Sequence, residues 1–169
     1  MANRIDKDVE VTIVNNTHGS FSYNFKGTII ELDDFGDEDY LTFGELKTMS
    51  SSKHKSILRD LMILITEVDS DDFTVDDVIE QLKLTKYYKP LNNIVDDLST
   101  ESIEDFVINS SEEDFRKALK EDSLKLVLIE TSSNLYRQGK FTNFSKLRDL
   151  GNVLGIEDYN TYFSDIAPK

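Results

Sequence analysis

The stretch Val9-Glu10-Val11-Thr12-Ile13 decides the fold class, because its apolar and polar side chains alternate with a period of two, as in a half-buried strand. A turn-rich sequence follows it, Asn15-Asn16-Thr17-His18-Gly19-Ser20. Two further strand-like runs come next, Phe21 to Phe25 and Thr28 to Leu32, with Gly27 between them. The N-terminal region therefore predicts an antiparallel β-meander of three or four strands, in which consecutive strands are neighbours.

A loop and two short helices are predicted after these strands. Asp33 to Asp39 is expected to be an acidic loop. Thr42-Phe43-Gly44-Glu45 has the pattern of a capping box, so a helix is expected from there through Met49, and a second from Lys53 to Asp60. The run from Leu61 to Glu67 fits either a buried strand or the end of that second helix, since periodicity cannot decide for so short a run.

From Thr74 onward, the spacing of the apolar residues changes to that of amphipathic helices. The first stripe, at positions i, i+3, i+4 and i+7, consists of Val75, Val78, Ile79 and Leu82. Pro90 fits the first position of a second helix, whose apolar stripe runs to Leu98. Helix starts are then predicted at Thr100 or Ser102, at Ser111, before Leu124 and at Asn143.

Glycines and apolar stripes complete the prediction for the helical region. The longest helix contains Leu124 to Leu135 and is expected to end before Gly139, and the helix that begins at Asn143 to end at Gly155. The residues expected to be buried in these helices and in those before them are Ile103, Phe106, Val107, Phe115, Leu119, Leu124, Val127, Leu128, Leu135, Phe144, Leu147 and Leu150. Tyr159, Tyr162 and Phe163 are placed on a final turn.

The predicted fold class is α+β, an N-terminal antiparallel meander followed by a bundle of about six short helices. The composition changes near Asp69-Ser70-Asp71-Asp72. We therefore expect residues 1–68 to form a β-rich part with one or two short helices, and residues 69–169 to form a helical part. A chain of 169 residues can bury a core without disulfides or metal ions.

The formal net charge of −14 limits the classes of partner. Residues 1–50 hold ten acids and four bases, residues 51–100 ten and six, and residues 101–169 thirteen and nine, so the acidity is spread along the chain. A field of this sign repels phosphate backbones, which argues against nucleic-acid binding. Basic protein partners remain, as does the simpler interpretation that the charge serves solubility.

Composition also excludes several kinds of site. The chain has no cysteine, which excludes disulfides and thiolate chemistry. The N-terminus lacks the apolar run of a signal peptide, and the longest apolar stretch, Leu61 to Ile65, is too short to cross a bilayer. The sequence therefore predicts a protein that is made in a cytoplasm and has no membrane partner.

Two acidic motifs have spacings that invite a metal-site interpretation. Asp69, Asp71, Asp77 and Glu80 occupy positions 1, 3, 9 and 12 of a calcium-loop frame, but Phe73 and Thr74 stand where that frame needs a ligand and a glycine. These acids are better explained as the N-terminal cap of the helix that follows. Asp34-Phe35-Gly36 spells a kinase tripeptide without the other kinase motifs, and is interpreted as a coincidence in a loop.

Three further groups receive structural interpretations. The only histidines, His18 and His54, lack the neighbours of a catalytic triad or a zinc helix, and are expected to be exposed. The Phe21, Tyr23 and Phe25 stripe is expected to be the buried side of a sheet. Lys53, Lys55 and Arg59 form a basic cluster that is expected to be solvated. No catalytic, cofactor-binding or metal-binding residue is therefore predicted, and the chain is not expected to be an enzyme.

One set of motifs is similar to a known group of proteins. The alternating Val9, Val11 and Ile13 with their Asn/Gly turn, the aromatic Tyr23, the helix start Thr42-Phe43-Gly44-Glu45-Leu46 and the phrase Gly139-Lys140-Phe141-Thr142-Asn143-Phe144-Ser145-Lys146 resemble small virion proteins of tailed bacteriophages. The similarity covers most of the chain in layout and some 20 residues in letter. The resemblance implies a non-enzymatic subunit of the head, neck or tail, and it transfers no residue roles.

Two functions follow as expectations. The first is a virion structural protein, made in the host bacterial cytoplasm, which contacts other virion subunits and forms a homo-oligomer within a symmetric assembly. The alternative is an acidic soluble inhibitor, or DNA mimic, that binds a basic host or defence protein, as the net charge of −14 suggests. The sequence leaves open which virion substructure would contain the protein, its copy number and its partners.

Overall fold

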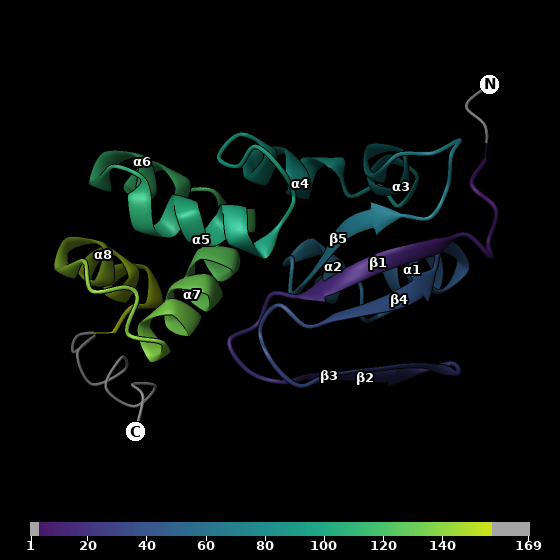
Figure 1. Ribbon diagram of the computed structural model, residues 1–169, viewed down its shortest axis with the longest axis horizontal. Helices are drawn as coiled ribbons and strands as arrows, with labels where there is room; N and C mark the ends of the chain where they lie inside the picture. Colours follow the sequence, from purple (N-terminus) through teal and green to yellow (C-terminus); the bar gives the residue numbers. More distant parts are fainter. Residues whose placement is uncertain (1–3, 157–169) are drawn as a thin grey trace.

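The computed structural model describes residues 4–156, and within this range the chain forms five strands and eight helices (Figure 1). The strands are β1 (Glu10–Asn15), β2 (Phe21–Phe25), β3 (Thr28–Leu32), β4 (Glu38–Thr42) and β5 (Ile63–Val68). The helices are α1 (Phe43–Ser51), α2 (Ser56–Arg59), α3 (Val75–Gln81), α4 (Thr85–Asn92), α5 (Thr100–Asn109), α6 (Glu112–Ala118), α7 (Asp122–Arg137) and α8 (Phe144–Leu154). The predicted α+β class, with strands first and a helical region after them, is confirmed.

The strand pairing differs from a meander. β1 lies between β4 and β5 in an antiparallel three-stranded sheet, whereas β2 and β3 form a separate two-stranded hairpin. The buried side chain of Asn15 explains part of this difference, because its Nδ2 donates to the carbonyl oxygens of Gly19 at 2.8 Å and Asp34 at 2.9 Å. These bonds fix both ends of the hairpin segment to the end of β1, so the hairpin leaves the sheet there and the chain returns to pair β4 with β1.

Two segments are strands where the sequence predicted a loop or left strand and helix open. The expected acidic loop ends earlier than Asp39, because β4 begins at Glu38, where the chain pairs with Val14. The run after Leu61 is a strand and not a helix end. Its residues Ile63 to Ile65 are buried and pair antiparallel with β1. The strand that the alternating sequence predicts, β1, is thus the central strand of the sheet, and β4 and β5 pair with its two edges.

Most predicted helix boundaries are confirmed by their capping geometry. Thr42 and Glu45 form a reciprocal capping box at the start of α1, and the Ser111 hydroxyl accepts from the N–H of Asp114 at 3.0 Å at the start of α6. Asn143 caps α8, which ends at Gly155 with a φ of 68°. These caps are local interactions, which explains why sequence alone could place them.

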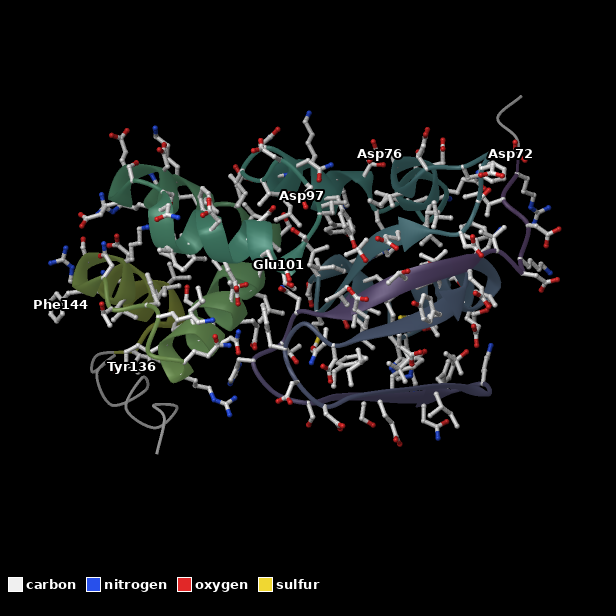
Figure 2. The ribbon with its side chains drawn as sticks, viewed as in Figure 1. Asp72, Asp76, Asp97, Glu101, Tyr136 and Phe144 are labelled. Atoms are coloured by element: carbon white, nitrogen blue, oxygen red, sulfur yellow. The ribbon has the colours of Figure 1, made fainter. Side chains whose placement is uncertain are left out.

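The position of Pro90 and the exposure of Phe144 differ from the prediction. Pro90 lies inside α4, which begins at Thr85 and ends at Asn92, and not at the first position of a helix running to Leu98. Proline lacks an N–H for the i−4 bond, and α4 ends two residues after it. Phe144 at the first position of α8 is 62% exposed, and Figure 2 shows it projecting from the end of the helix. Phe106, also expected to be buried, is only partly buried against the core.

One continuous core connects the two parts of the chain (Figure 1). α3 and α4 lie next to β5, and α5 to α8 form the opposite end of the molecule. In α7, every residue from Thr131 to Leu135 is buried, so this helix is enclosed on all sides over these five residues. No helix in residues 4–156 is long and apolar enough to cross a bilayer. Tyr159, Tyr162 and Phe163 lie outside the described residues.

Candidate interaction surface

An open groove lies between α4, α5 and α6. It has a volume of about 700 Å³ and continues into a neighbouring hollow of about 610 Å³ through the shared residues Ile94, Phe106 and Ser110. We call the two together the α4–α5–α6 groove. Its apolar lining consists of Pro90, Ile94, Val95, Phe106, Ala118 and Leu124.

Carboxylates dominate the charged lining of the α4–α5–α6 groove. They are Asp96, Glu101, Asp105, Asp114 and Glu121. Two lysines also line it, and Lys117 is already paired with Glu113 at 3.0 Å and Asp114 at 3.7 Å. Residues 90–115 contain no Lys or Arg and eight acids, namely Asp96, Asp97, Glu101, Glu104, Asp105, Glu112, Glu113 and Asp114. The groove therefore combines an apolar floor with a negative rim.

Asp97, which follows the groove residue Asp96, is held by the start of α5. The Ser99 hydroxyl accepts from the N–H of Ser102 at 3.1 Å, and the Ser102 hydroxyl donates to the Asp97 carboxylate. Hydrogen bonds from Ser102 and Ser99 lower the pKa of Asp97, so this group remains ionised. Figure 2 shows Asp97 and Glu101 near the junction of the helical region with the sheet.

Of the four acids in the calcium-loop frame, Asp77 caps the helix that follows, as expected. The Asp77 carboxylate accepts from the Thr74 N–H and from its hydroxyl, both at 2.7 Å, and these bonds lower the pKa of Asp77. Over residues 4–156, no group of three or more His, Asp or Glu side chains could hold a metal ion. Asp34-Phe35-Gly36 lies in the loop before β4, where Gly36 has a φ of 85°.

The two histidines are less exposed than the sequence suggested. The His18 side chain is 31% exposed, and its Nδ1 contacts the carboxylate of Glu130 in α7. The backbone N–H of His18 donates to the same carboxylate at 2.7 Å, and Arg137 donates to the His18 carbonyl. These bonds join the turn after β1 to α7. A contact between residues 112 positions apart leaves no local signal in sequence.

His54 belongs to an aromatic cluster with the β2–β3 hairpin. Its ring contacts those of Tyr23, at a centroid distance of 5.4 Å, and Phe25, at 4.8 Å, both edge to face. Phe21 and Tyr23 are buried and Phe25 is partly buried, which confirms the interpretation of this stripe as the inner side of a sheet. The hairpin is thus packed on the segment between α1 and α2.

The predicted basic cluster does not act as one group. Lys53 and Lys55 are exposed, as expected. The Arg59 guanidinium lies 5.7 Å from the centroid of the Tyr87 ring, and the Lys86 ammonium lies 4.8 Å from the same ring. Arg59 is therefore partly covered by α4 and not wholly solvated.

Sequence reasoning missed the buried Lys146. This residue is 1% exposed, and its Nζ donates to the carbonyl oxygens of Val107 at 2.7 Å and Ile108 at 3.3 Å, and to the Ser110 hydroxyl at 3.2 Å. Lysines are seldom fully buried, so composition predicts the opposite. The available signal was its spacing from Leu147 and Leu150 on the inner face of α8.

The fold thus assembles the α4–α5–α6 groove from residues of separate helices. Comparisons with protein-family models, with curated proteins and with solved structures found no match to this chain.

Proposed function

We propose that this chain is a non-enzymatic interaction protein, a structural subunit of a tailed-phage virion that binds neighbouring virion proteins. The observation that carries the interaction role is the α4–α5–α6 groove, whose apolar floor is rimmed by carboxylates. The virion assignment is supported by the resemblance of the N-terminal strands, the Thr42 helix start and the Gly139 to Lys146 phrase to small phage virion proteins.

The chemistry of the groove indicates the kind of segment that it would bind. Ile94 and Phe106 offer apolar surface, and Glu101 and Asp105 offer negative charge one helical turn apart. An amphipathic helix of a partner could place its apolar face on this floor, with Lys or Arg side chains at the rim. Complementary charge of this type favours fast association and rejects partners of like charge.

Co-purification with particles tests the virion role. Gradient-purified phage particles, analysed by quantitative mass spectrometry, should contain the protein at a fixed ratio to the major capsid protein. A phage protein that is made in infected cells but not packaged serves as the control for carry-over. If this chain is lost from particles together with that control, the virion role is wrong.

A pair of charge-reversal variants tests the groove. Glu101→Lys with Asp105→Lys should remove the protein from particles, because it reverses the rim without touching the core. Asp72→Lys with Asp76→Lys is the matched control, since both of these acids are exposed and do not line the groove. Equal incorporation of both variants would show that the groove makes no assembly contact.

The alternative role, an acidic inhibitor that mimics DNA, is favoured by one observation. Four exposed carboxylates are visible on one face in Figure 2: Asp72 and Asp76 along the top, and Asp97 and Glu101 further in, toward the middle of the molecule. A DNA mimic needs carboxylates ordered on one face, and its binding to a basic partner should weaken steeply with salt. Absence from particles, together with salt-sensitive binding that DNA competes away, would favour this role over the virion role.

A further inference from the structure

A second hollow gathers the cations of the N-terminal region in one place. A pocket of about 630 Å³ lies where the start of β3, the end of β4 and α1 meet the N-terminal segment. Its lining includes Arg4, Lys7, Lys26 and Lys47. These are all four basic residues among the first fifty, a stretch that also holds ten acids. We call this hollow the basic pocket.

Main-chain contacts bring these residues together. The N–H of Gly44 donates to the carbonyl of Lys7 at 2.9 Å, and the N–H of Phe43 donates to that of Val9 at 2.8 Å. A Cβ at Gly44 would lie 3.2 Å from both the Cβ and the carbonyl oxygen of Lys7, so glycine permits this close approach. Lys47 lies one helical turn after Gly44 in α1. It is therefore on the side of α1 that faces the segment carrying Lys7.

A third cation, Lys26, comes from the tip of the hairpin. Lys26 occupies the turn between β2 and β3 with a φ of 51°, and its ammonium lies 5.4 Å from the centroid of the Phe25 ring. The hairpin and the three-stranded sheet are separate sheets, so their arrangement in the fold brings Lys26 to the same pocket as Lys47.

The cations of the basic pocket are not neutralised by the protein. Within residues 4–156, none of the four forms an ion pair, although the chain has many more acids than bases. Two carboxylates, those of Asp8 and Glu45, line the pocket against four cations. Clefts lined by one sign of charge concentrate ligands of the opposite sign.

Glu45 is already committed to the fold. Its carboxylate accepts from the Thr42 N–H at 2.8 Å, the Thr42 hydroxyl at 2.9 Å and the Thr28 hydroxyl at 3.1 Å. Burial alone would raise the pKa of Glu45, but these hydrogen bonds lower it. The first N–H groups of α1 are also used, because those of Phe43 and Gly44 donate to Val9 and Lys7. A ligand would therefore be held by the cationic side chains.

We propose that the basic pocket binds an acidic segment of a partner protein, through ion pairs with Arg4, Lys7, Lys26 and Lys47. The four cations come from separate elements, namely the N-terminal segment, the hairpin and α1, and this spread suits several carboxylates along a peptide better than one compact phosphate. The net charge of −14 repels a long polyanion such as DNA. A short acidic segment is attracted locally, because screening at about 0.15 M salt reduces interactions beyond about 8 Å.

This proposal concerns a surface separate from the α4–α5–α6 groove and does not depend on the virion role. The probe is a fluorescein-labelled hexaglutamate peptide, titrated with the full-length protein at about 0.15 M salt and followed by fluorescence anisotropy. Lys7→Glu with Lys47→Glu should weaken binding by about tenfold or more. Lys120→Glu with Lys140→Glu makes the same change in net charge at exposed positions elsewhere, and should weaken binding less than about twofold.

Several outcomes would overturn the proposal. They are equal weakening by both double variants, no binding by the wild-type protein up to about 1 mM, and tighter binding of a labelled single-stranded DNA than of the peptide. Displacement of the peptide by inorganic phosphate at equal charge concentration would likewise show a site for small anions. Circular dichroism of both variants, with an unchanged unfolding midpoint in urea, would confirm that loss of binding is not loss of folding.

Discussion

Lys146 in α8 donates a hydrogen bond from its buried ammonium to the carbonyl oxygen of Val107 in α5, at 2.7 Å. The Phe115 ring lies 5.3 Å away, on the α6 side of the same group. The last turn of a helix has carbonyl groups without intrahelical partners, and a cation is favoured there by the helix dipole. One side chain thus connects three helices of the C-terminal region.

Replacing this lysine tests that role. Lys146→Met keeps an unbranched side chain that is one heavy atom shorter, and leaves the carbonyls of Val107 and Ile108 and the Ser110 hydroxyl without this donor. We expect the free energy of unfolding in urea to fall by about 1–3 kcal/mol. Lys120→Met, at an exposed position, is the control and should change it by less than about 0.5 kcal/mol. An unchanged free energy of unfolding in Lys146→Met would contradict the capping role.

The same residue gives a pH dependence. Burial lowers the pKa of Lys146, partly opposed by the negative charge of Glu112. Between this lowered pKa and the ordinary value of 10.5, the unfolded chain binds the proton that the folded chain releases. Wild-type stability relative to Lys146→Met should therefore rise with pH in this alkaline window. Urea unfolding of both proteins across that range measures the difference, and a flat difference would show that burial does not shift this group.

Tyr88 in α4 makes the opposite prediction. Its hydroxyl is buried and accepts from the N–H of Ile65 at 3.0 Å, and burial raises the pKa of Tyr88 far above the ordinary tyrosine value. Tyr88→Phe should cost about 1–2 kcal/mol at neutral pH, because the Ile65 N–H loses its acceptor. Above pH about 10, the unfolded chain releases the Tyr88 proton and the folded chain keeps it, so the wild-type advantage should shrink as pH rises.

Tyr87→Phe is the control for this comparison, since Tyr87 is only partly buried. Thermal or urea unfolding of the wild-type protein, Tyr88→Phe and Tyr87→Phe is measured at neutral and alkaline pH. It gives the stability difference between wild type and each variant at each pH. An advantage of wild type over Tyr88→Phe that grows with pH would contradict the burial of this hydroxyl.

The contact between His18 and Glu130 is expected to stabilise the turn after β1 against α7. Glu130→Ala removes the acceptor of the His18 N–H and ring. Unfolding should become easier by about 1–2 kcal/mol, and hydrogen exchange of the His18 amide should accelerate. Glu121→Ala, at an exposed position before α7, should leave the exchange of that amide unchanged. Unchanged protection of His18 in Glu130→Ala would mean that this contact does not hold the turn.

Gly44→Ala tests the packing of the N-terminal segment against α1. Replacing a helical glycine by alanine ordinarily stabilises a protein by about 0.5–1 kcal/mol. Here the new Cβ would lie 3.2 Å from Lys7, so the segment that carries Lys7 must shift. We expect no gain in stability, and weaker binding of the hexaglutamate probe to the basic pocket. Ser50→Ala in the same helix is the control and should leave probe binding unchanged.

Local patterns predicted many of the elements and several of their boundaries. The alternation from Val9 to Ile13, the Thr42 capping box and the caps at Ser111 and Asn143 all depend on residues within four positions of one another. The exposure of Phe144 could not be predicted in this way, because its apolar spacing continues the stripe while its position at the start of α8 places it in solvent. The sequence predicts Pro90 at the first position of a helix, whereas it lies inside α4, because proline prefers the first helical position but is not restricted to it.

The sequence by itself determined that this is an acidic α+β protein whose strands precede its helices, because side-chain periodicity, turn residues and caps are interactions between near neighbours. The tertiary structure alone decided that β1 pairs with β4 and β5, that Lys146 is buried against α5, and which charged residues line the α4–α5–α6 groove and the basic pocket. Each of these depends on groups that are distant along the chain. Their proximity is set by how the whole core packs, and no local pattern encodes it.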